Sequence, residues 1–153
     1  MITLTRGTED IEARSESWLL YGIATIVRKV SERMLAPLGV SMAQMPVLVV
    51  LRDARHPLMI SEVARRLYLE TPSITTMIDR LSERDLVERI DDPKDRRKTL
   101  IALTQKGRGV LNRICGPYRD LHEEMFGVLD DDERENLMAT MQKFCRGNLH
   151  LLE

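Results

Sequence analysis

The sequence predicts a mainly helical fold with one small β-hairpin, an α+β arrangement in the order α-α-α-α-β-β-α-α. Three observations lead to this prediction. Apolar residues recur along most of the chain at intervals of three and four, as in helices that bury one face. Aromatic residues make up only 4% of the chain against nine methionines, which favours packed helices over a β-sandwich. Over two segments near the middle of the chain the apolar period shortens towards two, as in strands.

The chain of 153 residues is expected to form one domain, because a chain of this length can bury a core without disulfides or metals. Its two cysteines are too few for a disulfide framework, so a reducing compartment is the simplest reading. It shows neither a cationic leader nor an apolar run long enough to cross a bilayer, and we expect a cytoplasmic protein. The net charge of −1 means that any nucleic-acid surface has to be local.

Two helices are predicted in the first third of the chain. Apolar residues at helical spacing over 10–35 indicate one long helix, which Pro37 and Gly39 end. Ser41 and Gln44 then form the spacing of a capping box, followed by a short apolar run. The second helix is therefore expected to begin near Ser41.

Two short helices with a tight turn between them follow. Ser61 is predicted to cap the third helix, and Thr71 with Pro72 marks the start of the fourth. The apolar residues of the fourth helix recur at i, i+3, i+4 and i+7 and should face the core. Its other faces carry small polar and basic side chains: Ser73, Thr75, Thr76 and Arg80.

A β-hairpin is predicted next. Its strands are 86–90 and 99–103, and the turn-rich stretch 91–95 separates them. The tip concentrates basic side chains around one carboxylate, that of Asp95. These basic residues are Lys94, Arg96, Arg97 and Lys98.

Two further helices complete the chain. Thr104 is expected to cap a helix over about 105–128, and Asp130 with Glu133 forms the capping box of a last helix that ends near Leu149. The carboxylates at 130–132 could suggest acid/base chemistry, but capping and the helix dipole explain them. No phosphate-binding glycine loop or nucleophile motif is visible, so we expect no enzyme.

A helix pair followed at once by a hairpin is the winged helix-turn-helix arrangement, whose second helix enters the major groove of DNA. Short hydroxyl side chains allow a close approach to base edges, which makes Ser73, Thr75 and Thr76 candidates for base contacts. Basic side chains suit phosphates, and an arginine at a hairpin tip can enter the minor groove. The alternatives are an ordinary solvated helix face and a solvated charge run.

The motifs resemble those of the MarR family of winged helix-turn-helix regulators. The resemblance is carried by 86–89 (LVER), 91–97 (DDPKDRR), 103–107 (LTQKG) and 74–81 (ITTMIDRL), and it extends over almost the whole chain. It implies that Asp95 pairs with Arg97 and that Arg97 reaches the minor groove. It also implies a homodimer built by the N- and C-terminal helices, 10–37 and 105–150, around a DNA-binding lobe at 41–104.

Two positions depart from the pattern of this family. Thr76 stands where many relatives carry a basic residue, so the set of phosphate contacts is open. Asp85 replaces the usual glycine before the first strand of the hairpin, and this position asks for a left-handed backbone. Asp tolerates that conformation better than most residues, so the fold is still expected.

Dimerisation has an independent argument, because the first helix and the last two carry more apolar residues than a domain of this size can cover, most clearly near the C-terminus. An exposed apolar surface of that extent usually marks an interface, and a two-fold dimer would present two recognition helices about one turn of DNA apart. The alternative is a monomer with a larger helical core. The surplus residues are Leu137, Met141, Phe144, Leu149, Leu151 and Leu152.

The resemblance further implies a small, often aromatic and anionic effector, bound between the dimer helices and the DNA-binding lobe. Candidate pocket residues are Trp18, Tyr21, Met45 and His56, for which core packing is the simpler explanation. No other cofactor is expected. No Cys/His cluster has metal-site spacing, so we also expect no metal.

The sequence thus predicts a ligand-responsive repressor that binds an inverted-repeat operator as a homodimer. Two alternatives remain open. The winged fold could be a protein-interaction module whose basic tip meets an acidic partner, or the same scaffold could sense oxidants through Cys115 or Cys145. Both cysteines lie on apolar helical stretches, which favours buried and inert thiols.

Overall fold

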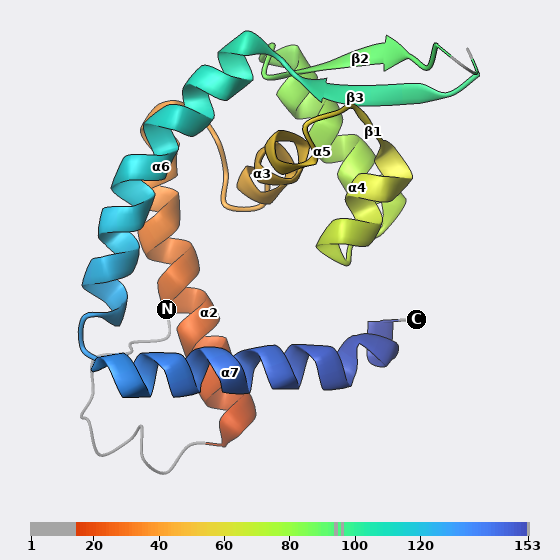
Figure 1. Cartoon of the computed structure of the whole chain (residues 1–153). Coiled ribbons are helices and arrows are strands. Elements are labelled where there is room, and N and C mark those ends of the chain that lie inside the picture. The colour runs from red at the N-terminus through yellow and green to blue at the C-terminus, as the bar shows by residue number, and fades with distance from the viewer. Residues whose placement is uncertain (1–14, 94, 96, 153) are drawn as a thin grey trace. The chain divides into compact units, whose positions relative to one another are not determined.

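The computed structural model describes residues 15–93, 95 and 97–152 (Figure 1). The chain divides into two compact units, the first ending at Met42 and the second beginning at Ala43. Among the described residues, helices dominate and a three-stranded antiparallel sheet accompanies them. The mainly helical fold with a small hairpin is therefore confirmed. None of the described helices is long and apolar enough to cross a membrane.

The first unit contains helix α2, Glu16–Leu35, and the 3₁₀ helix η1, Ala36–Leu38. Gly39 adopts a left-handed conformation with φ 66°, which terminates the helical path as Pro37 and Gly39 predict. The predicted start of the helix at residues 10–14 lies outside the described residues. Along α2, all of which the structure describes, Ser31 and Leu35 are the buried residues. Six of its large apolar side chains, from Trp18 to Ile26, are between 38% and 55% exposed.

The second unit begins with a cluster of three helices. These are α3, Met45–Ala54, α4, Ile60–Leu67, and α5, Thr71–Glu83. The faces that the helices turn towards one another are apolar, and their side chains form the core of the unit. The fully or almost fully buried residues of these helices include Val47, Leu48, Leu51, Val63, Ile74, Ile78 and Leu81, and Leu58 and Ile101 from the strands described below are buried with them.

Two helix starts differ from the prediction. Helix α3 begins at Met45 with Gln44 at its N-cap, so the expected capping role of Ser41 is wrong. Pro46 in the first turn fixes φ there, which explains the later start. Ser61 lies inside α4, because the extended backbone continues only as far as Met59. The Met59 N–H donates to Glu62 Oε2 at 2.9 Å and closes this helix end instead.

The sheet has the strand order β1-β3-β2. Strands β2, Val87–Asp91, and β3, Thr99–Leu103, form the predicted hairpin, here called the wing (87–103). Strand β1, Leu58–Met59, pairs with the other edge of β3 and was not predicted, since two residues show no period. In Figure 1 the wing extends beyond the helix cluster, while β1 pairs with Leu100 and Ile101 of β3 and so ties the wing to that cluster.

Two long helices follow the wing. Thr104 caps α6, Gln105–Phe126, by accepting a hydrogen bond from the Gly107 N–H at 2.9 Å, as predicted. Asp130 and Glu133 form the predicted capping box of α7, Asp131–Asn148, and the 3₁₀ helix η2, Leu149–Leu152, follows. Helix α6 buries residues only in its first half. Helix α7, described throughout, buries none.

Candidate nucleic-acid interface

Helices α4 and α5 are joined by a turn at residues 68–70. Tyr68 ends α4 in a left-handed conformation with φ 55°, and the Leu69 N–H donates to the Ala64 carbonyl at 3.0 Å. This short connection sets α5 against α4, with Ile74 and Ile78 buried between them and the rest of the lobe. The arrangement is a helix-turn-helix, and α5 occupies the place of its recognition helix.

The outward face of α5 carries the predicted polar residues. Ser73, Thr76 and Arg80 are exposed, and their spacing of i, i+3 and i+7 places them on one face. Thr75 is half-buried and lies on a flank of that face. The structure therefore brings together three of the four helix residues proposed from the sequence, with the fourth at their border.

The two threonine hydroxyls already donate within the helix. Thr75 Oγ1 lies 2.9 Å from the Thr71 carbonyl oxygen, and Thr76 Oγ1 lies 3.1 Å from that of Pro72. Each hydroxyl hydrogen is thus engaged in a bond to the preceding turn. The groups that remain for a partner are the methyl groups and the oxygen lone pairs. These suit a thymine methyl or a base amino group better than a base acceptor.

The tip of the wing is organised around Asp95. Asp95 Oδ1 accepts from Arg97 Nε at 3.1 Å and from the Arg97 backbone N–H at 3.2 Å. The pair that the resemblance implied is therefore present. Arg97 holds the pKa of the Asp95 carboxyl below its ordinary value through these side-chain and backbone hydrogen bonds. The Arg97 side chain is nonetheless 91% exposed, so the rest of its guanidinium is accessible.

Backbone hydrogen bonds close the same loop. The Lys98 N–H donates to the Asp95 carbonyl at 2.8 Å, and the Asp92 N–H donates to the Lys98 carbonyl at 3.0 Å. The Lys98 side chain is exposed, with Nζ 4.0 Å from Asp95 Oδ2. Lys94 and Arg96, also predicted to contact DNA, lie outside the described residues.

The base of the wing is fitted tightly to α6. Asp85 has φ 59°, which confirms the left-handed conformation expected at this position. Thr104 Oγ1 donates to the Asp85 carbonyl at 2.7 Å. A Cβ atom on Gly107 would lie 2.1 Å from the Leu86 carbonyl oxygen, so only glycine allows this approach. Helix α6 therefore begins in direct contact with the corner between α5 and β2.

Sequence reasoning missed an ion pair between α5 and the wing. Arg89 Nη2 on β2 lies 2.6 Å from Asp79 Oδ1 on α5. The two residues are ten positions apart, across a turn whose geometry no local pattern reveals. Opposite charges on the recognition helix and the first wing strand were the only available signal.

The four predicted pocket residues lie in different units of the chain. Trp18 and Tyr21 are on α2, where their ring centroids are 5.7 Å apart. Met45 opens α3, and His56 follows that helix with Nδ1 3.0 Å from the Pro57 carbonyl oxygen. The side chains of Trp18 and Tyr21 are 38% and 55% exposed.

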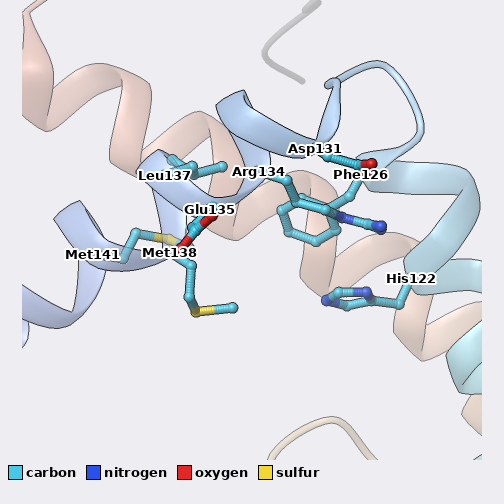
Figure 2. A pocket seen from close by; sticks show the side chains of 8 residues that line it. All are labelled: His122, Phe126, Asp131, Arg134, Glu135, Leu137, Met138 and Met141. Atoms are coloured by element: carbon cyan, nitrogen blue, oxygen red, sulfur yellow. The ribbon is translucent and has the colours of Figure 1, made fainter.

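A pocket that the sequence analysis did not predict lies where α6 meets α7 (Figure 2). Its volume is about 310 Å³, and its walls are largely apolar. Arg134 Nη1 pairs with Glu123 Oε2 at 2.9 Å, and the guanidinium lies 5.8 Å from the centre of the Phe126 ring. The lining residues are His122, Phe126, Asp131, Arg134, Glu135, Leu137, Met138 and Met141.

Both cysteines are free and exposed in the described chain, so the expectation of buried thiols is wrong. Cys115 lies beside the buried Ile114 but points from the flank of α6, where Arg52 Nη1 is 3.4 Å from its Sγ. Cys145 lies on α7, whose side chains are not buried in this chain. Among the described residues no group of histidine, cysteine and carboxylate side chains could hold a metal ion.

Comparisons with known proteins agree with this architecture. The sequence profile of the MarR family matches residues 38–98. Multiple antibiotic resistance protein MarR of Escherichia coli is 32% identical over 112 residues, 71% of this chain and 76% of MarR. The HTH-type transcriptional regulator MhqR of Bacillus subtilis is 34% identical over 76 residues, and that alignment spans about half of each protein, 50% and 52%.

The likeness extends to three dimensions. A crystal structure of a mutant E. coli MarR complexed with operator DNA matches with a TM-score of 0.78 and 28% identity, over 84% of this chain and 91% of that one. Together with the helix-turn-helix and the basic wing, these findings define a protein of the winged-helix class found in transcription regulators. More particularly, the chain belongs to the MarR family.

Proposed function

We propose that this protein binds double-stranded DNA and regulates transcription, with α5 in the major groove and the wing tip in the minor groove. The single observation that carries the proposal is that the Arg97 side chain is both exposed and held in one direction. Its side chain is 91% exposed at the end of a projecting hairpin, yet Asp95 fixes its direction. An arginine prepared in this way suits the strongly negative minor groove.

Each predicted contact has a role in this proposal. Ser73, Thr75 and Thr76 read base edges, the two threonines through methyl groups and lone pairs. Arg80 and Lys98, both exposed, bind phosphates on either side of the major-groove contact. Lys94 and Arg96, the remaining basic residues of the tip in the sequence, add contacts to the DNA backbone through their charge.

A homodimer is part of the same proposal, supported by the exposed apolar side chains of α2 and α7. On α2 the side chains of Tyr21, Ile23 and Ile26 are at least half exposed. Phe144 on α7 is 57% exposed, and the pocket beside α7 is open. Apolar surface of this extent favours burial by a second copy. The two α5 helices of such a dimer, related by a two-fold axis, would then select an inverted-repeat operator. Bound there, the protein would act as a repressor.

We also propose that a small aromatic or anionic effector controls DNA binding, as the family resemblance implies. Trp18, Tyr21, Met45 and His56 remain the candidate pocket residues, and the exposed rings on α2 support the aromatic part. Because coupling between two binding sites is reciprocal, an effector that weakens DNA binding must itself bind more weakly to the DNA complex. Benzoate and hydroxybenzoates are suitable probes, and calorimetry with and without duplex would measure this difference.

The main rival function is a protein-interaction module, and salt separates the two. Contacts to phosphates release counterions, so the logarithm of duplex affinity should fall linearly with the logarithm of salt concentration. The slope of this line should be about −1 for each phosphate contact. Fluorescence anisotropy of a labelled pool of random duplexes, titrated from low to moderate salt, measures this slope. No affinity for duplex at low salt would favour the rival instead.

Arg97→Ala provides the matched variant for this titration. Because Arg97 is almost fully exposed, its loss should leave the fold intact while reducing both the affinity and the salt slope. Arg119→Ala is the control, since Arg119 is also well exposed, at 77%, but lies on α6. Equal loss from both variants would indicate a general charge effect rather than a contact made by the wing.

A further inference from the structure

We propose that Asp79 and Arg89 are positioning residues that fix the wing relative to α5, so that the two DNA-reading elements act as one body. The inference rests on the proposed DNA binding and adds to it. It assigns no base contact to either residue. Their role is to set the distance between the major-groove and minor-groove contacts.

The geometry singles out this pair. Arg89 Nη2 lies 2.6 Å from Asp79 Oδ1, a short charge-assisted hydrogen bond. Asp79 lies one turn after Thr75, on the same side of α5. Arg89 lies at the middle of β2, opposite Ile101 of β3, so both wing strands are held through it.

The wing needs such a link because of its shape. Its inner end is anchored by buried Leu86 and Val87, whereas its tip lies beyond the helix cluster (Figure 1). Strand β1 holds one side of the wing, because Leu58 and Met59 pair with Ile101 and Leu100 of β3, whereas β2 is the open edge of the sheet. A small rotation about the anchored end moves Arg97 by a larger distance. The ion pair lies at the level where β1 pairs with β3, and it ties β2, the strand that β1 does not contact, to α5, so it limits that rotation.

The pair is exposed enough that its value for stability alone is small. The side chains are 40% exposed for Arg89 and 49% for Asp79, and exposed ion pairs contribute little to unfolding free energy. Losing it should therefore leave the unfolding midpoint almost unchanged. The effect should appear in DNA affinity, through the fraction of molecules whose wing is correctly placed.

Asp79→Asn gives a test in which the sign of the effect is decisive. Simple electrostatics predicts tighter DNA binding, because the substitution removes a negative charge close to a polyanion. The positioning role predicts weaker binding, by about two- to fivefold, in line with the modest coupling of exposed pairs. Anisotropy titrations against one duplex at fixed salt measure the difference. Unchanged or tighter binding by Asp79→Asn would overturn the proposal.

A double-mutant cycle shows whether Asp79 acts through Arg89. In an Arg89→Gln background the pair is already broken, so Asp79→Asn should cause no further loss and should even tighten binding slightly. An equal loss in both backgrounds contradicts the proposal. Glu88→Gln is the matched control, since Glu88 is an exposed acid next to Arg89 on the same strand and should show only the electrostatic gain.

A second measurement needs no DNA, so failure of the proposed function can be distinguished from failure of this inference. Spin labels at Ser73→Cys and Thr99→Cys report the distance between α5 and the wing, after Cys115 and Cys145 are replaced by serine. Labelled protein is diluted with unlabelled protein to isolate distances within one chain. We expect a narrow distribution that Asp79→Asn broadens or shifts. Identical distributions would overturn the positioning role even if duplex binding were strong.

Discussion

One carboxylate oxygen of Asp95 accepts from both the backbone and the side chain of Arg97, at 3.2 and 3.1 Å. The wing tip and the direction of its guanidinium are therefore set together, before any partner arrives. Preorganisation of this kind lowers the ordering cost of binding. Substitutions at Asp95 and at Arg97 can therefore measure separately what each residue contributes to binding.

Asp95→Asn should weaken duplex binding although it removes a negative charge. The amide still accepts a hydrogen bond but no longer pairs with a cation, so Arg97 loses its fixed direction. We expect a smaller loss than for Arg97→Ala, which should cost about 1 to 3 kcal/mol as a specific arginine contact. Anisotropy titrations of both variants check this order. Tighter binding by Asp95→Asn would show that the pair does not prepare the wing for DNA.

The Asp95 carboxyl should titrate below its ordinary pKa of 3.8 in the folded protein. Because the folded pKa is lowered, the stabilisation from the pair is complete above the ordinary value and is lost as the pH falls through the lowered one. The wing tip should thus remain paired throughout neutral and mildly acidic pH. Carbon-detected NMR of the aspartate carboxyls measures the midpoint, and Arg97→Ala should raise it. A midpoint at or above 3.8 in the parent protein would contradict the pairing.

Gly107→Ala should destabilise the lobe, since the new Cβ would meet a backbone carbonyl that cannot move aside easily. The expected loss is about 1 to 3 kcal/mol, the usual cost of overpacking. Gly109→Ala, two residues along the same helix, should instead be neutral or stabilise by up to about 1 kcal/mol, because a Cβ there meets nothing within 4 Å. Urea unfolding at one protein concentration compares the two. Similar losses from both would mean that the close approach to Leu86 is unimportant.

Phe144→Glu should shift the protein from dimer towards monomer. Phe144 is 57% exposed on a helix that buries none of its residues within one chain, so a charge is tolerated in the monomer but not in an apolar interface. Sedimentation velocity across micromolar concentrations gives the equilibrium. Lys143→Glu, which makes a larger change of charge on the neighbouring exposed residue, is the control. A parent protein that sediments as a monomer would rule out the proposed assembly.

Local signals in the sequence predicted much of the fold. The caps at Thr104 and at Asp130 with Glu133 were read correctly, because a side-chain cap depends on residues three positions apart. The left-handed Asp85 was also expected correctly, but from the family resemblance, because Asp85 stands where the family usually carries a glycine. The cap assigned to Ser61 was wrong because strand pairing of Leu58 and Met59 fixed the helix start instead.

The candidate site was predictable in its parts but not in their connections. The polar face of α5 and the basic tip follow from residue types and periods, and the Asp95–Arg97 pair from a short motif. The bond between Asp79 and Arg89 depends on how β2 leaves α5, which is a tertiary property. The pocket between α6 and α7 likewise depends on the angle of a helix corner. The exposure of Cys145 could not be read from sequence because apolar neighbours on α7 remain uncovered within one chain.

Selection of bound duplexes from a random pool tests the central claim most directly. The account predicts enrichment of an inverted repeat whose half-sites lie about one helical turn apart, with A·T pairs favoured where the wing tips meet the minor groove. Arg97→Ala should lose the A·T preference while keeping the repeat. A pool that shows no enrichment over its starting composition, or a single unpaired half-site, would contradict a dimeric regulator that reads DNA with α5 and the wing.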